Sequence, residues 1–294
     1  MRKRKNRNGT FNQRIGTLDW ILFVILGIYA LLIIYPFYNS FLISISPESV
    51  YLEEPFLIWP KQIIWDNYVA VFQSAQLWSG FRITLFLLIV GTAYQLFFTV
   101  ITGYALSRSN WLGKNFVMNM IIVTMFFGGG LIPYYYLINN LGLYNKIWVM
   151  IIPGAIDTYN MLLMRNYFAS LPPDMEESAK IDGASDIQIF ARVYLPMALP
   201  MLATVGLFFA VGNWNSWYNG MLYIEKAELK PLQLVLREMI VTSNSQMEVP
   251  GQVVVYSEGL TMASIFFTIV PMMCFYPFLQ RFFVKGLVVG AIKG

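Results

Sequence analysis

"DMEESAKIDGASDIQIFARVYLPMALP", residues 174–200, is a charged and glycine-interrupted stretch in a chain that is otherwise strongly apolar. The 294 residues are 57% hydrophobic and only 12% charged, with a mean hydropathy of +0.56. This composition is typical of a membrane protein with several spans and excludes an ordinary soluble domain. The stretch is therefore interpreted as a segment outside the membrane that connects two apolar helices.

Apolar segments long enough to cross a bilayer precede and follow this stretch, since a helical span needs about 20 apolar residues. The sequence contains six such segments, and one of them includes a carboxylate, Asp157. We therefore predict an all-α polytopic membrane protein with six transmembrane helices within residues 19–285. Their expected ranges are 20–42, 83–107, 115–138, 147–167, 196–222 and 259–281.

Positively charged side chains are distributed unevenly between the two sides of these expected helices. Most of the 20 lysines and arginines, including those of the leader MRKRKNRNGTFNQR, fall on the same side as residues 174–200. That side is expected to be cytoplasmic, because positive charge is retained there. We predict a multi-pass protein of the cell membrane with a cytoplasmic basic N-terminus at residues 1–18 and a cytoplasmic tail at 286–294. The first apolar segment is too long for a cleaved signal peptide and lacks a small-residue cleavage site, so a retained anchor is expected.

Residues 170–196 carry the pattern of two short helices joined by a turn. Two prolines and three acids suit the first turn of a helix and its positive end, and Gly183 is placed to end that helix. Ser185 and Gln188 form a capping-box pattern for a second helix, which Pro196 is expected to stop. The apolar positions predicted to face the membrane domain are Ile187, Phe190, Ala191 and Tyr194.

The opposite face of this predicted helix-turn-helix carries small residues and acids. Ser178, Ala179 and Gly183 would let another surface approach the backbone closely. Glu177 and Asp182 can accept hydrogen bonds from that surface. The pattern describes a docking site, but from spacing alone an ordinary structured loop is the preferred interpretation.

Residues 177–196, ESAKIDGASDIQIFARVYLP, resemble the EAA loop of ABC importer permeases. The pattern of this loop begins with Glu, a small residue and Ala, and a Gly follows after three further residues. After another nine residues come a branched apolar residue, one more residue and Leu-Pro. Glu177, Ala179, Gly183, Val193, Leu195 and Pro196 occupy these positions. The departures are Ser178 for the usual Ala and Val193 for the usual Ile. Other segments resemble the second permease of maltose-type carbohydrate importers along nearly the whole chain: GYALSR at 103–108, GGGLIPYYYLINNLGLYN at 128–145, LLMRNYF at 162–168 and QRFFVKGLVVGAIKG at 280–294. GGGLIP and PLQLVLR resemble the Gram-positive branch, which imports complex plant or polysaccharide fragments that often contain uronic acids.

The resemblance implies a permease subunit of an importer, in which the EAA loop docks on a separate cytoplasmic ATPase. It implies a heterodimer with a second permease, two ATPase copies, and an extracytoplasmic solute-binding protein that delivers an oligosaccharide to residues 47–80 and 225–258. ATP and Mg are expected only on the ATPase, because the chain lacks the G-x-x-x-x-G-K-[ST] pattern, so neither a cofactor nor enzyme activity is expected here. The tail GAIKG is either a second contact with the ATPase or a frayed terminus. The residues that the resemblance assigns to ATPase docking are Glu176, Glu177, Ser178, Ala179, Asp182, Gly183, Ala184, Leu195 and Pro196.

Candidates for the substrate path are polar and aromatic, because sugars bind through hydrogen bonds to hydroxyls and through aromatic faces. They are Asp157, Tyr159, Asn160, Asn213, Trp214, Asn215, Trp217 and Tyr218. An aromatic belt at the membrane surface explains the last cluster at least as well, and Asp157 can simply pair with neighbouring backbone. No Lys or Arg lies at mid-span, so the charge of the oligosaccharide stays open.

Several alternatives concern the membrane part of the chain. FFGGGLIPYYY, residues 126–136, predicts a broken or kinked helix, which serves either close helix packing or a hinge beside a substrate path. An ion-driven secondary transporter would account for this break and for Asp157, but not for the loop. An intramembrane enzyme would lack an acid-base pair, since the chain has no histidine and no second mid-span acid. The single cysteine, Cys274, provides neither a disulfide nor a metal site, and no soluble domain is left to bind nucleic acid.

Overall fold

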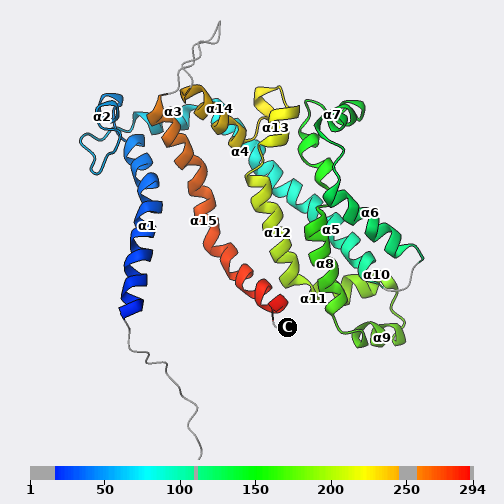
Figure 1. Ribbon diagram of the computed structural model, residues 1–294. Helices are drawn as coiled ribbons and strands as arrows, with labels where there is room; N and C mark the ends of the chain where they lie inside the picture. The colour runs from blue at the N-terminus through cyan, green and yellow to red at the C-terminus, as the bar shows by residue number, and fades with distance from the viewer. Residues whose placement is uncertain (1–16, 109–111, 245–256, 292–294) are drawn as a thin grey trace, which may run out of the picture.

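The computed structural model describes residues 17–108, 112–244 and 257–291, and within these residues every regular element is a helix (Figure 1). The prediction of an all-helical chain is therefore confirmed for the described part. Residues 1–16 of the expected N-terminal segment and residues 292–294 of the expected tail lie outside it, as do residues 245–256 of the second outer segment.

Long helices stand side by side across the molecule, from α1 at one edge through α15 and α12 to α5, α8 and α6 at the other (Figure 1). Their bounds are α1 (Thr17–Ser44), α15 (Glu258–Ala291), α12 (Leu199–Trp214), α5 (Thr92–Ser107), α8 (Thr158–Ser170) and α6 (Lys114–Phe126). By length and composition, two described helices can cross a membrane, Asp19–Ser44 and Ala75–Ser107, or up to five if each bent pair counts as one span. The stretch Ala75–Ser107 is long because α4 (Ala75–Phe86) continues through a π-helical turn, Leu87–Gly91, directly into α5.

The run of three glycines breaks a helix, as its composition predicts. Here α6 ends at Phe126, and α7 (Leu131–Asn140) starts at an angle of 116° to it. Gly130 has a φ of +84°, a left-handed conformation that glycine adopts without steric cost. The expected span over residues 115–138 therefore contains the predicted break, which lies at residues 127–130.

The expected helix over residues 147–167 is also divided. Its first part forms two 3-10 turns, Ile147–Met150 and Ile152–Gly154, which meet α8 at 42°. Pro153 has no N–H with which to continue an α-helical hydrogen-bond ladder, which explains the division. Asp157 consequently lies at the start of a helix and not inside one.

The two ends of the bundle are built differently (Figure 1). At one end lie short helices of the two expected outer segments, α2 (Glu48–Glu53), α3 (Asp66–Gln73) and α14 (Leu232–Asn244). With them lies α13 (Tyr218–Tyr223), which was expected to belong to the span 196–222. The apolar face of α14 is fixed there, since Leu232 and Val235 are fully buried against Val71 and Leu77. At the opposite end, residues 170–196 form α9 (Asp174–Ile181), α10 (Asp186–Ile189) and α11 (Leu195–Met197).

Candidate functional site

The turn in the loop 170–196 is closed by local hydrogen bonds. Gly183 has a φ of +78°, and its N–H donates to the carbonyl of Lys180 at 3.0 Å. The next N–H, of Ala184, reaches back to the carbonyl of Ala179 at 3.0 Å, so α9 ends in a Schellman motif. The predicted capping box is present at the start of α10, where Ser185 and Gln188 exchange their backbone and side-chain hydrogen bonds. The turn is therefore held in one shape by its own sequence.

The second half of the loop corrects the predicted apolar stripe. After α10 the chain forms a π-helical turn over Phe190–Tyr194, which places residues five apart on one face. Ile189 and Tyr194 are accordingly each 1% exposed, and they pack with Met164 and Phe168 of α8. The expectation was wrong for Ile187, which is 79% exposed, and for Ala191, because the wider turn shifts the helical phase. The helix also continues past Pro196 to Met197, and the chain bends by 77° between Met197 and Leu199.

Apart from Glu176, the predicted docking residues fall into two groups. Glu177, Ser178, Asp182, Gly183 and Pro196 are exposed. Ala179, Ala184 and Leu195 are only partly exposed and pack against the cluster of Ile189 and Tyr194. The small side chains of Ala179 and Ala184 therefore allow the loop to lie close to the bundle, while the first group faces away from it.

Three large apolar side chains on the exposed face were missed in the sequence. Met175, Ile181 and Ile187 are 51%, 86% and 79% exposed. In an apolar chain such residues are readily assigned to the membrane-facing side. One signal was present in the sequence: Ile181 stands between Lys180 and Asp182 at the end of a polar helix, away from any apolar stripe. Bare isoleucines on a polar loop indicate a contact surface.

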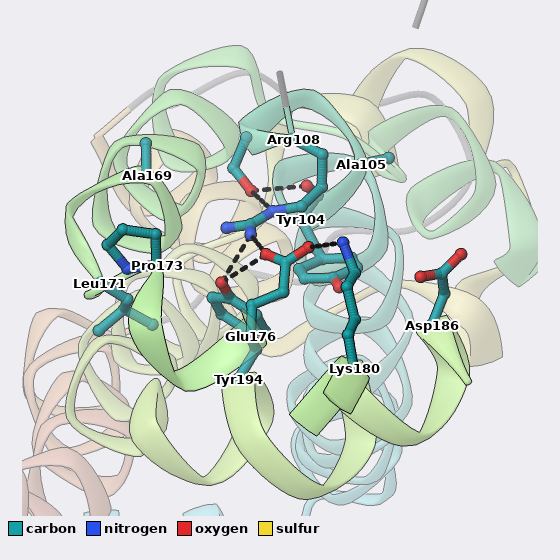
Figure 2. Close-up of a pocket in the computed structure, with 11 residues that line it drawn as sticks. Tyr104, Ala105, Arg108, Ala169, Leu171, Pro173, Glu176, Lys180, Asp186 and Tyr194 are labelled. Atoms are coloured by element: carbon teal, nitrogen blue, oxygen red, sulfur yellow. Dashed lines mark hydrogen bonds and ion pairs between the residues drawn. The ribbon is translucent and has the colours of Figure 1, made fainter. Parts of the chain in front are cut away.

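The loop is anchored to the bundle by charged and aromatic side chains, which we call the anchor cluster: Arg108, Glu176, Lys180 and Tyr194 (Figure 2). The guanidinium of Arg108, which follows α5, forms an ion pair with the carboxylate of Glu176 and donates to the Tyr194 hydroxyl at 2.6 Å. That hydroxyl donates to Glu176 at 2.9 Å, and Lys180 Nζ lies 2.7 Å from the other carboxylate oxygen. The Arg108 guanidinium carbon also lies 4.2 Å from the centre of the Tyr194 ring.

The position of Glu176 differs from that of the other predicted docking residues. Its side chain is 18% exposed, and both carboxylate oxygens are already paired within the chain. Around the anchor cluster lies an open cavity of about 750 Å³, lined also by Tyr104, Ser107 and Asp186. Glu176 therefore ties α9 to the end of α5. The sequence could not reveal this pair, because 68 residues separate its members.

The anchor cluster favours the ionised carboxylate of Glu176. Burial raises the pKa of this carboxyl, but hydrogen bonds from Lys180 and Tyr194 and the charge of Arg108 outweigh burial and lower the pKa below its ordinary value. The hydrogen bond and the charge of Glu176 in turn raise the pKa of Lys180. Glu176 is therefore an anion held by three partners at neutral pH.

Acid is expected to loosen this anchor. A depressed pKa in the folded state means that Glu176 stabilises the loop above its ordinary pKa of about 4.5 and that this contribution is lost as pH falls through the folded value. Amide hydrogen exchange in Asp174–Ile181, corrected for intrinsic rates, should accelerate in the wild type as the pH falls below the ordinary pKa of the Glu176 carboxyl. The Glu176→Gln variant should show a smaller acceleration between pH 7 and 3, because only the other acids of α9, Asp174 and Glu177, remain to be protonated there. Equal pH profiles for the two proteins would contradict the assignment.

The substrate-path candidates of α8 have structural partners. The Asp157 carboxylate caps this helix and accepts from the backbone N–H of Asn160 at 2.8 Å. The pairing with neighbouring backbone, one of the two alternatives, is therefore the one observed. Asn160 is 8% exposed, and its side-chain oxygen lacks a hydrogen-bond partner among the described residues. Tyr159 is 56% exposed.

The candidates around the end of α12 also include both buried residues with structural partners and exposed residues. Asn213 is 7% exposed and donates to Thr92 and Gln95 of α5 at 3.1 and 2.9 Å, so it joins two helices. Trp214 and Asn215 line one hollow beside α14 and α15, and Trp217 lines the adjoining one. Tyr218 is 48% exposed. The structure does not bring the α8 candidates and this second group to one site.

Comparisons with known proteins agree along most of the chain. Protein LplC of Bacillus subtilis (strain 168) is 38% identical over 272 residues, which cover 92% of each chain. The polygalacturonan/rhamnogalacturonan transport system permease protein YtcP of the same organism is 31% identical, over 94% of this chain and 98% of the relative. A solved bacterial ABC transporter involved in the import of the acidic polysaccharide alginate has a chain with a TM-score of 0.83 and 34% identity, covering 90% of this chain and 96% of that one. Since residues 17–289 also match the family model of the binding-protein-dependent transport system inner membrane component, the chain belongs to that family of transport permeases.

Proposed function

We propose that this permease forms the membrane path of an ABC importer for an oligosaccharide, with ATP hydrolysis carried out by separate ATPase subunits. The observation that carries the proposal is the loop 170–196. It has a rigid glycine turn, it is tied to α5 by the anchor cluster, and it exposes apolar side chains at one end of the bundle. Such a loop can transmit the motion of a soluble partner to a membrane helix.

The orientation follows from this assignment. The loop lies in the cytoplasm with both termini, six transmembrane helices cross the membrane, and α3, α13 and α14 face outside. ATP and Mg bind to two copies of the ATPase. A second permease completes the path, and an extracytoplasmic binding protein delivers the substrate to the two outer segments, residues 47–80 and 225–258.

Relatives support an oligosaccharide as the substrate class. Besides YtcP, a relative in Halalkalibacterium halodurans, 25% identical over 94% of this chain and 97% of its own length, is an arabinooligosaccharides transport system permease protein. The alginate importer adds a polysaccharide to these named substrates. The ion-driven alternative loses its main support, because the Asp157 carboxylate serves as a helix cap.

Substitution of Gly183 tests the docking role. Gly183→Arg is expected to remove the ATPase from the complex, because a non-glycine residue at a φ of +78° strains the turn by about 1–2 kcal/mol and the arginine side chain projects into the open space beside it. Gly183→Asn is the matched control, since Asn tolerates the left-handed conformation. The measurement is copurification of the ATPase and of the second permease from native membranes. A wild-type chain that is isolated alone and still transports would overturn the proposal.

A further inference from the structure

A groove runs along the outer end of the bundle between the end of α12, α14 and α15. Two adjoining hollows of about 510 and 230 Å³ share Gln233, Thr268 and Ile269. Aromatic and carboxamide side chains of the GNWNSWYNG segment, residues 212–220, contribute to it from one side. The groove therefore lies where substrate enters if the proposed function is correct.

The charged group of this groove is Arg237 of α14. Its guanidinium carbon lies 4.0 Å from the centre of the Trp217 ring. A guanidinium stacked on an indole keeps its in-plane N–H groups available, and these match the geometry of a carboxylate. Arg237 is exposed, and among the described residues no carboxylate lies within ion-pair distance of it. The neighbouring Glu238 is engaged by Lys230 at 2.6 Å.

Neutral polar groups accompany this cation. Gln233 lies one helical turn before Arg237 and lines the same hollow. Asn215 uses its amide N–H for the carbonyl of Val211 at 3.0 Å, and the Thr268 hydroxyl donates to the carbonyl of Ser264 at 3.0 Å, so both oxygens can still accept. The remaining walls are apolar, with Ile265 and Ile269 among them. Amides, apolar walls and one stacked guanidinium together suit a sugar that carries a carboxylate.

We propose that this groove is a binding site for an acidic oligosaccharide, in which Arg237 pairs with the carboxylate of one uronic acid residue. The inference rests on the proposed function and deepens it. It also explains how a chain without a mid-span Lys or Arg can accept an anion, because the charge is recognised at the outer end of the path. Gln233 and Asn215 bind sugar hydroxyls, and the apolar walls contact the C–H faces of the sugar rings.

The test is uptake of radiolabelled trigalacturonate, galactotriose and the methyl ester of trigalacturonate by cells that carry the complete importer. Arg237→Gln is expected to lower trigalacturonate uptake about tenfold or more relative to wild type, since it removes a charge-assisted bidentate hydrogen bond. Uptake of the methyl ester, where it occurs, should not fall. Arg237→Lys should retain part of the trigalacturonate uptake, because lysine keeps the positive charge but lacks the two parallel N–H donors of the guanidinium. Arg82→Gln is the matched control, as Arg82 is exposed on α4 and does not line the groove.

The other possible results would contradict the binding site, the acidic substrate or the importer assignment. Equal trigalacturonate uptake by Arg237→Gln and Arg82→Gln would overturn the binding site. Loss of the second permease from the purified Arg237→Gln complex would also overturn it, because the groove would then be a subunit interface. Wild-type cells that take up only galactotriose or the methyl ester would overturn the acidic substrate and leave the importer intact. No oligosaccharide uptake at all, or uptake without ATP, would overturn the importer as well.

Discussion

Replacement of Ile181 by glutamate is expected to abolish ATP-driven uptake and to release the ATPase from the purified complex. Ile181 is 86% exposed, more than any other large apolar residue of the loop 170–196. Burial of an isoleucine in an interface stabilises it by about 1.5–3 kcal/mol, and a glutamate there would in addition be desolvated without a partner. The expected loss of affinity is about 100-fold or more. Copurification of the ATPase and uptake in cells measure the two effects.

Two further substitutions control this experiment. Ile181→Leu keeps the apolar volume and should retain the ATPase. Ile63→Glu places the same charge on an isoleucine that is 55% exposed in the expected first outer segment, and it should leave the ATPase bound. Full ATPase occupancy of the Ile181→Glu complex would mean that this side chain faces water in the assembly, and the docking surface would then have to lie elsewhere.

Features of the loop that depend on local rules were predictable from sequence. A glycine followed by Ser185 and Gln188 specifies a Schellman turn and a capping box, because each hydrogen bond joins residues at most five apart. The glycine run at 128–130 broke its helix for an equally local reason. These features need no knowledge of the rest of the molecule.

Features that depend on packing were not predictable in the same way. Ile189 is buried and Ile187 is exposed beside the π-helical turn at Phe190–Tyr194, although the helical stripe predicted from the sequence contained Ile187 and not Ile189. Stacking of Arg237 on Trp217 joins α14 to the connection between α12 and α13, so the groove could not be inferred from the aromatic segment alone. The short 3-10 turns before α8 likewise placed Asp157 at a cap, where composition suggested a buried acid.

Replacement of Arg108 by glutamine is expected to separate ATP hydrolysis from transport. The variant should keep the ATPase bound, because the exposed face with Ile181 and Gly183 is not altered. Its uptake should fall about tenfold, since α9 loses an ion pair to the end of α5 that we value at about 1–2 kcal/mol for side chains 26% and 18% exposed. ATPase activity of the purified complex should persist, so the ratio of sugar transported to ATP hydrolysed is the quantity to measure.

A double-mutant comparison shows whether Arg108 and Glu176 act as one unit. If the anchor cluster transmits motion between α9 and α5, Arg108→Gln combined with Glu176→Gln should be no worse than the more severe single variant, because residues in one network are not additive. Additive losses would indicate separate roles, with Glu176 acting through Lys180 or Tyr194 instead. Loss of the ATPase from Arg108→Gln would indicate that the anchor shapes the docking face itself. Retained coupling in both single variants would leave packing of Ile189 and Tyr194 on α8 as the connection that carries the motion.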